Sequence, residues 1–304
     1  MKALVMGGNG FIGSHVVDSL LTNGHSVRVF GRRPEKFRAP LVGVDYRLAS
    51  FDDVPSLSEA LEGVDVVYHF ISTTVPSTSN KDPIYDVNSN LIGTIRLLNL
   101  MREQGVHRIV YLSSGGTVYG IPDLSPISEE HKLRPICSYG VVKVSIESYL
   151  QMYQYLYGIR PVILRVSNPY GERQGHAGVQ GVVATFMRQI CVGEPIEIWG
   201  DGSVIRDYIY VKDLAELCLR AGESETTGIY NAGSGIGRSV SQILSAVSAL
   251  VKWDVTPVYK SRRSYDVPEV VLSVDKVKAD FDWAPVTDLG DGLTRTWEWY
   301  NEIN

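Results

Sequence analysis

A tyrosine and a lysine four residues apart have the clearest chemical potential in this sequence. The segment Ser138–Lys143 reads Ser-Tyr-Gly-Val-Val-Lys and opens a helical pattern, which places Tyr139 and Lys143 on one helix face. A phenol with a pKa of about 10 is a poor base at neutral pH, but a nearby ammonium group favours the phenolate. The pair therefore predicts proton abstraction from an alcohol. The alternative is a surface tyrosine beside a salt-bridging lysine.

A glycine-rich loop near the start of the chain predicts dinucleotide binding. Gly7, Gly10 and Gly13 follow the apolar run Ala3–Met6 and precede a helical pattern from Ser14. This spacing permits a tight turn, places a pyrophosphate at the helix N-terminus, and allows close packing of helix and strand. The candidate cofactor-binding positions are Gly7, Gly10, Phe11, Ile12 and Gly13.

The end of the second predicted strand bears on which dinucleotide is bound. A carboxylate there normally accepts hydrogen bonds from the adenosine ribose of NAD, but the segment reads Phe30-Gly31-Arg32-Arg33. Arg32 and Arg33 would suit a 2′-phosphate, because guanidinium groups bind phosphate through charge-assisted hydrogen bonds. The sequence thus favours NADP or mixed use over NAD alone, the alternative being two solvated surface arginines.

The elements that position these residues alternate between apolar runs of strand length and amphipathic segments of helix length. Continuous apolar runs are typical of strands buried on both faces, so we expect an α/β fold of the Rossmann type with a doubly wound parallel sheet. The expected strands are 3–6, 26–30, 65–69, 108–112 and 162–166, and the clearest helices are 84–103 and 138–157.

The pattern changes after about Asn168 to glycine-rich loops, isolated strands at 196–199 and 206–211, and helices at 179–191, 239–251 and 288–300. We expect residues 1–168, with a return of about 205–235, to form the dinucleotide-binding domain. Residues 169–204 and 236–304 would form a smaller, mixed substrate domain packed directly against it.

Composition excludes several classes of protein. The 304 residues carry 29 Lys and Arg against 34 Asp and Glu, a net charge of -5, which argues against nucleic acid or an anionic membrane as partner. Three cysteines without a CxxC pair predict neither a disulfide framework nor a zinc finger, and six histidines without HxxH or HxxE spacing predict no metal site. No apolar run reaches membrane-spanning length. We expect a soluble, unprocessed, cytoplasmic protein.

Further motifs occur in a fixed order along almost the whole chain. They are Gly7–Gly13, His69, Asn88-x-Asn90-x-x-Gly93-Thr94, Ser113–Gly120, Tyr139-x-x-x-Lys143, Leu164–Gly171 and Arg206-Asp207-Tyr208. In this order the sequence resembles the extended short-chain dehydrogenase/reductase family, and within it the sugar-nucleotide epimerases of the UDP-galactose (UDP-glucose) 4-epimerase type.

The resemblance implies that Tyr139 is the general base and that Lys143 holds the nicotinamide ribose and lowers the phenol pKa. The family's third catalytic position, usually Ser or Thr, falls on Gly115, which has no hydroxyl. Strand alternation places Thr117 on the same side as Gly115 and Ser114 on the other side, unless the strand has already ended. We therefore favour Thr117 as the hydroxyl donor, with Ser114 second.

The resemblance also implies contacts to the cofactor. His69, at the end of a predicted strand, and Asn88 would lie near it. The family commonly has an Asp that contacts adenine near Leu48–Phe51; here the nearest carboxylates are Asp52 and Asp53. Adenine recognition is therefore left open between them.

The second domain resembles a clamp for a nucleotide diphosphate sugar. The resemblance implies that Asn168 contacts the ligand phosphates, that Ile198 and Trp199 face the base, and that Arg206 and Arg263 bind the diphosphate. Taken singly, each arginine could equally form a surface ion pair.

One position of the resemblance concerns the sugar itself. Val270 lies four residues after Asp266 and matches the family's pocket gate, where a bulky aromatic side chain would crowd a 2-acetamido group. The smaller valine implies tolerance of N-acetylated sugars, although Tyr265 stands where the family usually has Gly and could refill the space.

The leading hypothesis is a sugar-nucleotide 4-epimerase, an isomerase acting on a UDP-hexose or UDP-N-acetylhexosamine through transient oxidation and re-reduction at C4 on bound NAD or NADP. The alternative is an NADPH-dependent 4-ketoreductase of a nucleotide-linked deoxysugar, favoured by Arg32 and Arg33. A dehydratase is disfavoured because Gly116-Thr117 replaces the family's Asp-Glu pair, and a non-catalytic redox sensor is disfavoured by the intact Tyr139 and Lys143. The resemblance further implies a homodimer through the helices at 84–103 and 138–157.

Overall fold

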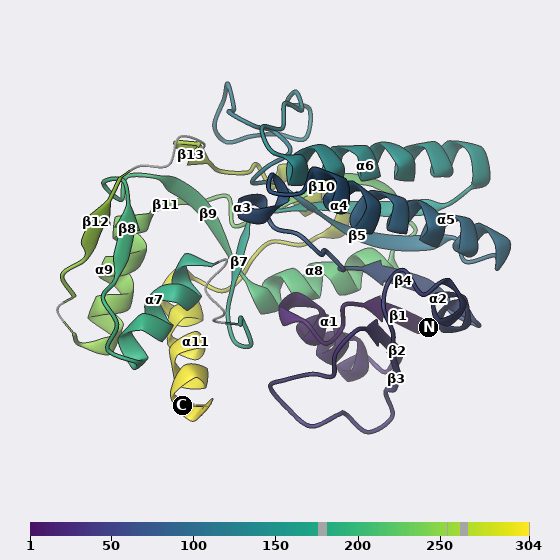
Figure 1. Ribbon diagram of the computed structural model, residues 1–304, viewed down its shortest axis with the longest axis horizontal. Coiled ribbons are helices and arrows are strands. Elements are labelled where there is room, and N and C mark those ends of the chain that lie inside the picture. The colour runs from purple at the N-terminus through teal and green to yellow at the C-terminus, as the bar shows by residue number, and fades with distance from the viewer. Residues whose placement is uncertain (176–180, 254, 262–266, 304) are drawn as a thin grey trace.

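A seven-stranded parallel sheet forms the larger part of the molecule (Figure 1). The structure is a computed structural model, and it describes residues 1–175, 181–253, 255–261 and 267–303. Its strand order is β10-β6-β5-β4-β1-β2-β3. The strands are β1 (Lys2–Met6), β2 (Ser26–Gly31), β3 (Asp45–Leu48), β4 (Val66–His69), β5 (Arg108–Ser114), β6 (Arg160–Val166) and β10 (Gly228–Ala232). The predicted doubly wound α/β fold is confirmed.

Helices cover both faces of this sheet (Figure 1). One face packs on α1 (Phe11–Thr22), α8 (Val211–Glu223) and α10 (Asp275–Phe281), and the other on α2 (Val54–Leu61), α5 (Gly93–Glu103) and α6 (Ser138–Tyr157). Strand β1 shows why its sequence is apolar throughout. Because side chains alternate along a strand, Ala3 and Val5 are buried on the first face while Leu4 and Met6 are buried on the second.

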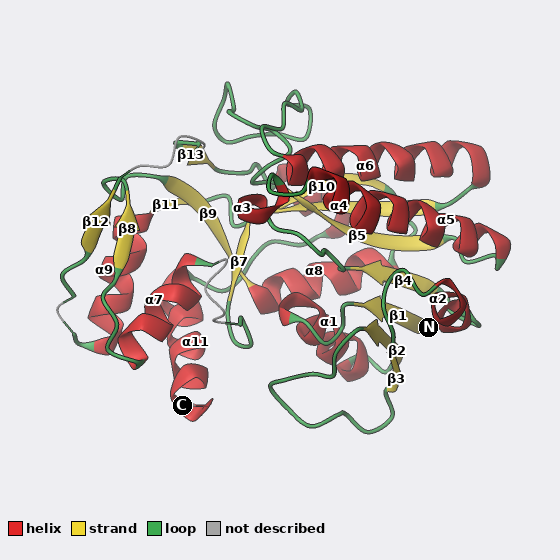
Figure 2. Ribbon diagram, in the orientation of Figure 1, coloured by secondary structure: helices red, strands yellow, loops and turns green. Residues whose placement is uncertain are grey.

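The smaller lobe is mixed (Figure 2). Strand β9 (Ile205–Tyr210) pairs antiparallel with β11 (Gly237–Ser239) and parallel with both β7 (Asn168–Tyr170) and β13 (Glu269–Val270). A separate parallel pair joins β8 (Glu197–Trp199) to β12 (Val258–Lys260). Helices α7 (Val182–Cys191), α9 (Val240–Val251) and α11 (Leu289–Ile303) pack with these strands around their own core.

The chain crosses between the two parts more than once. Within the expected return of 205–235, α8 packs on α1 and β10 extends the large sheet, whereas β9 lies in the small sheet. The boundaries of the two domains stay a prediction.

The segment expected as one helix over 84–103 is divided. The short helices α3 (Pro76–Ser79) and α4 (Pro83–Asp86) lead into a π-helix, η1 (Val87–Ile92), which continues directly into α5. π-Helical turns occur frequently at functional sites, and this one borders the site described below. In the described part of the chain, no helix is long and apolar enough to cross a membrane.

Candidate active site

A cavity of about 780 Å³ lies at the carboxyl ends of β1, β2 and β4, where ligands bind in open parallel sheets. Three loops line it, with residues from 7–11 after β1, 31–37 after β2 and 70–73 after β4. The side chains of η1 and α5 and the segment 50–52 complete the wall. Gly7, Gly10, Phe11, Arg32, Arg33 and Asn88, all predicted to contact a cofactor, line this cavity.

The glycine loop has the geometry that a pyrophosphate requires. Gly7 has φ +82°, a conformation that favours glycine, and its carbonyl accepts the Gly10 N–H at 2.9 Å. A Cβ at Gly13 would lie 2.2 Å from the Gly7 oxygen, so only glycine permits this close packing. Helix α1 begins at Phe11 without a side-chain cap, which leaves its first N–H groups for an anion. The loop therefore fits a dinucleotide, with Gly13 packed against it from the helix. Ile12 packs on the apolar core instead, and the described cavity lining includes neither Gly13 nor Ile12.

Tyr139 and Lys143 lie on the first turns of α6, with the Lys143 Nζ 5.5 Å from the centre of the Tyr139 ring. The same Nζ donates a hydrogen bond to the Leu112 carbonyl at 2.7 Å and lies 4.6 Å from the Tyr111 ring centre. Lys143 is buried, and Tyr139 is half-buried. The helix thus presents a phenol beside a fixed, largely dehydrated ammonium group.

The electrostatics of this pair differ from the expectation that Lys143 lowers the Tyr139 pKa. Burial raises the pKa of Tyr139 to about 12, and the nearby Ser72 side chain opposes this effect. Burial also lowers the pKa of Lys143 to about 8, against the attraction of Glu147 and Asp86. Ser72 lines the large cavity, where its hydroxyl donates to the Thr74 carbonyl at 3.0 Å.

The strand-alternation argument for Thr117 is wrong in its premise. Strand β5 ends at Ser114, and a turn follows in which the N–H groups of Thr117 and Val118 both reach the Ser114 carbonyl. The choice of Thr117 over Ser114 therefore needs another ground. The structure offers one, because the Thr117 hydroxyl is buried without a hydrogen-bond partner in the described residues. At Gly115, an added Cβ would lie 2.5 Å from the Leu272 side chain.

A buried carboxylate, not predicted from the sequence, holds the start of α6. Asp86 is fully buried; its Oδ2 accepts the Ser138 hydroxyl at 2.7 Å, and its Oδ1 accepts from Thr74 at 2.7 Å and from Asn90 at 2.9 Å. Since Ser138 precedes Tyr139, this network fixes where the phenol lies. The Asn90-x-x-Gly-Thr motif was a signal for Asn90, and Ser72 could have been found from its place after β4.

His69 lies behind the cavity wall. Its ring is 1% exposed, its Nε2 is 2.9 Å from the Thr94 hydroxyl, and it packs between Phe51 and Tyr111. Burial, with the nearby Lys143 charge, lowers the His69 pKa to about 3, so the ring is neutral at physiological pH. Its contact with a cofactor stays a prediction. Of the two candidate adenine carboxylates, Asp52 lines the cavity.

The other carboxylate, Asp53, has a local structural task. Its side chain accepts the Ser56 N–H at 3.2 Å and caps the N-terminus of α2.

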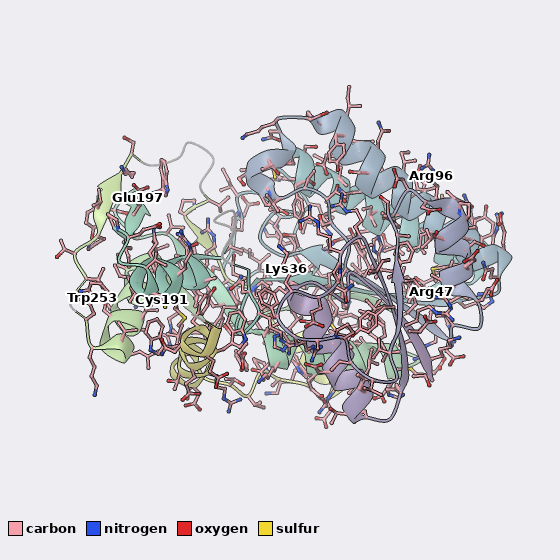
Figure 3. The ribbon with its side chains drawn as sticks, turned by 60° about the horizontal axis from the view of Figure 1, so that its bottom comes forward. Lys36, Arg47, Arg96, Cys191, Glu197 and Trp253 are labelled. Atoms are coloured by element: carbon pink, nitrogen blue, oxygen red, sulfur yellow. The ribbon has the colours of Figure 1, made fainter. Side chains whose placement is uncertain are left out.

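A second cavity of about 230 Å³ in the smaller lobe brings together Asn168, Ile198, Trp199 and Arg206. The Asn168 amide donates to the Asp207 carbonyl at 2.9 Å, which ties β7 to β9, and the Trp199 ring is 44% exposed. Figure 3 labels Glu197, which also lines this cavity, in the smaller lobe. Arg263 lies outside the described residues.

Val270, unlike the other described residues predicted to bind the substrate, does not line the second cavity. It is 2% exposed and packs with Val118, Tyr119 and Leu272. The described lining of neither cavity includes it.

Comparisons with known proteins agree with this arrangement. Residues 3–233 match the NAD dependent epimerase/dehydratase family. A relative from Methanocaldococcus jannaschii, a putative UDP-glucose 4-epimerase, is 34% identical over 99% of each chain.

Two solved structures are also similar. The UDP-glucose 4-epimerase of Thermotoga maritima with UDP-glucose has a TM-score of 0.95 at 34% identity, covering 100% of this chain and 99% of that one. The UDP-glucose 4-epimerase of Thermus thermophilus in complex with NAD has a TM-score of 0.92 at 33% identity, covering 99% of each chain. The family match, the relative and both structures lead to one assignment: this chain belongs to the NAD dependent epimerase/dehydratase family.

Proposed function

We propose that this enzyme is a sugar-nucleotide 4-epimerase acting on UDP-hexoses. The observation that carries the proposal is the placement of Tyr139. Its ring lies 5.5 Å from the Lys143 Nζ, and Ser72, whose side chain lowers the Tyr139 pKa, lies in the wall of a cavity that begins at a dinucleotide loop. A second cavity contains Asn168, Ile198, Trp199 and Arg206, four of the residues predicted to hold the substrate. The similarity of this chain to a UDP-glucose 4-epimerase whose structure was solved with UDP-glucose supports the same substrate class.

In the proposed mechanism, a bound nicotinamide supplies reversible oxidation and reduction at C4 of the sugar. Tyr139 takes the proton of the C4 hydroxyl at its phenolic oxygen and later returns it, so the phenol alternates between two protonation states. With its pKa raised to about 12, Tyr139 is mostly protonated at neutral pH, so the form that accepts the C4 proton is the phenolate left after the phenol proton has passed to solvent. The Ser72 side chain, which lowers the Tyr139 pKa, and the positive charge of a bound oxidised nicotinamide would favour the phenolate.

Substrate binding is assigned to the smaller lobe. Trp199 offers a stacking surface for uracil, and the Asn168 amide and the Arg206 guanidinium group provide donors for phosphate oxygens. The resemblance adds Arg263 as a further donor. A sugar bound there extends from the second cavity toward Tyr139.

For the sugar, we propose that 2-acetamido groups are accepted. The support is the resemblance alone, in which valine stands at a position that a bulky aromatic side chain would crowd; in the structure Val270 packs against Val118, Tyr119 and Leu272 and lines neither described cavity. Activity on UDP-N-acetylglucosamine comparable to that on UDP-glucose is expected. Absent or far lower activity on the acetamido substrate would reject the open gate.

We also propose a homodimer in the cytoplasm. Apolar side chains lie exposed along α4, η1 and α6: Ile84 is 73% exposed, Val87 37%, Val141 50% and Met152 40%. A second copy packed on this surface would cover them. Light scattering of the purified protein checks the oligomeric state, and a monomer would contradict the proposal.

The activity itself is tested by incubating purified enzyme with UDP-galactose and following the sugar H1 signals by NMR. Formation of UDP-glucose by the wild type, and its loss in Tyr139→Phe, is the expected result. The ketoreductase remains a second candidate because Arg32 and Arg33 line the cofactor cavity. Formation of no epimer by well-folded wild type would favour it.

A further inference from the structure

The end of β2 leaves open space at the place where an NAD-binding carboxylate would stand. Gly31 is the last residue of β2 and lines the cavity. A Cβ built on Gly31 meets no atom within 4 Å, and its φ lies outside the left-handed region. A larger side chain would therefore fit here, and glycine leaves the end of β2 open toward the cavity.

The wall around this space carries excess positive charge. Arg32, Arg33, Lys36 and Arg96 line the cavity, and Asp52 is the single carboxylate among its described lining residues. Figure 3 labels Lys36 and Arg96 on different elements of the nucleotide-binding part. A hydrogen bond from Ser50 and, more weakly, the charges of Arg96 and Arg32 hold the Asp52 pKa below its usual range. Asp52 thus offsets part of this charge.

The remaining cation of the lining differs from these four. Arg173 donates to Asp18 at 2.7 Å and to the His15 ring at 2.8 Å, so its charge is already paired within the protein. In the described part of the chain, no ion pair to a carboxylate is present at Arg33 or Lys36. Their charges are available to an anion at the cavity end.

Asn9 fixes the backbone of this region. Its Nδ2 donates to the Arg33 carbonyl at 2.7 Å, which joins the glycine loop to the segment after β2. The Asn9 Oδ1 has no hydrogen-bond partner in the described residues, and Asn9 lines the cavity. This oxygen offers an acceptor for a ribose hydroxyl in place of the missing carboxylate.

We infer that the adenosine end of this cavity is a 2′-phosphate site, so that the protein binds NADP in preference to NAD. The phosphate occupies the space beside Gly31 and accepts hydrogen bonds from Arg32 and Arg33, with Lys36 adding charge. The inference rests on the proposed function only in that a nicotinamide dinucleotide fills the cavity. It concerns affinity and leaves the reaction unchanged.

The test is a direct binding measurement on protein freed of copurifying nucleotide, by calorimetry with NADP⁺, NAD⁺, 2′,5′-ADP and 5′-ADP. The wild type should bind NADP⁺ at least about tenfold more tightly than NAD⁺, as charge-assisted hydrogen bonds to a phosphate contribute. The two adenosine fragments should show the same order, which separates a 2′-phosphate site from nicotinamide effects. Raised salt should reduce the difference.

Two sets of variants locate the effect. The double change Arg32→Ala with Arg33→Ala should weaken NADP⁺ binding about 10- to 100-fold and leave NAD⁺ binding nearly unchanged. Gly31→Asp should reverse the preference, because a carboxylate repels the phosphate and accepts from the ribose hydroxyls. Gly31→Asn is its uncharged control, and Arg47→Ala, an exposed arginine paired with Asp45 outside the cavity lining, should change neither affinity.

Tighter binding of NAD⁺ than of NADP⁺ by the wild type, or equal loss of both dinucleotides in the double variant, would overturn the 2′-phosphate site. Competition by inorganic phosphate equal to that by 2′,5′-ADP would show a general anion site instead. Failure to bind either dinucleotide would contradict the proposed function, which distinguishes the two conclusions.

Discussion

At the scale of single residues, Tyr139 is the group whose loss should be most costly. Tyr139→Phe removes only the phenolic hydroxyl, so we expect turnover of UDP-glucose to fall by about 10²- to 10⁴-fold with the melting temperature unchanged. Lys143→Ala should act similarly. Tyr155→Phe, at a side chain 89% exposed on the same helix, is the matched control. More than about a tenth of the wild-type rate in Tyr139→Phe would exclude it as the base.

The missing family hydroxyl at Gly115 leads to a second prediction. Thr117→Val should lower turnover more than Ser114→Ala. The reason is that the buried Thr117 hydroxyl has no hydrogen-bond partner within the described residues, so it is available to donate to the substrate. Steady-state kinetics of the two variants, compared at equal folded fraction, decide the order. A larger loss in Ser114→Ala would transfer the role to the last residue of β5.

Residue types and spacing predicted Tyr139, Lys143 and the glycine loop, because each forms a local pattern. They did not link Ser72 to Tyr139, because the two residues lie far apart in the sequence and act on one another only in the folded chain. The expected influence of Lys143 failed for the same reason: its ammonium group is held at the Leu112 carbonyl of a neighbouring strand.

At the scale of elements, the N-terminus of α6 is held by Asp86 at the junction of α4 and η1. Asp86→Asn replaces one acceptor oxygen by a donor and leaves the Ser138 hydroxyl or the Asn90 amide without its partner. We expect kcat to fall about 10- to 100-fold through misplacement of Tyr139, with little change in dinucleotide affinity. Asp123→Asn, on an exposed loop, is the control. Unchanged kcat in the Asp86 variant would show that α6 needs no such support.

The sequence predicts strands whose side chains are buried on both faces of the sheet, because such strands are apolar throughout. It does not predict elements whose limits are set by local hydrogen bonds. Strands β1, β2, β4, β5 and β6 carry continuous apolar runs. Strand β3 was missed because it is a half-exposed edge strand containing Asp45 and Arg47. The end of β5 is set by the turn at Ser114, and η1 differs from an α-helix by its hydrogen-bond spacing. A hydrophobic pattern shows neither feature.

At the scale of the whole molecule, two buried histidines predict how stability depends on pH. Burial lowers the pKa of His15 to about 4 and that of His69 to about 3, below the unfolded value of about 6.5. The unfolded chain therefore binds protons that the folded protein excludes, and stability falls as pH decreases from about 6.5 toward 4. Each histidine contributes about 2 kcal/mol of loss between pH 7 and pH 5.

Urea unfolding at pH 7, 6 and 5 measures this loss. His69→Gln should flatten the decrease, because one excluded proton is removed. His107→Gln, at an exposed position, is the matched control and should leave the slope as in the wild type. An equal slope in His69→Gln and wild type would contradict the assignment.

The sequence indicated two parts with distinct tasks, and the structure adds how they meet. The expected clamp residues Asn168, Trp199 and Arg206 share one cavity because β7 pairs with β9 and β8 lies beside them. Val270 could not be placed from its spacing, since its burial depends on packing against Val118 and Tyr119, which come from a distant segment of the chain.

The central claim is isomerisation without net oxidation or reduction, and one assay tests it directly. Purified enzyme is given UDP-galactose with catalytic dinucleotide and no added reductant, while sugar epimers and the oxidation state of the dinucleotide are followed together. We predict that UDP-glucose and UDP-galactose interconvert to equilibrium with no stoichiometric consumption of dinucleotide. Interconversion of no UDP-sugar epimers, together with stoichiometric oxidation of NADPH by a nucleotide-linked 4-keto sugar, would contradict the account and identify a ketoreductase.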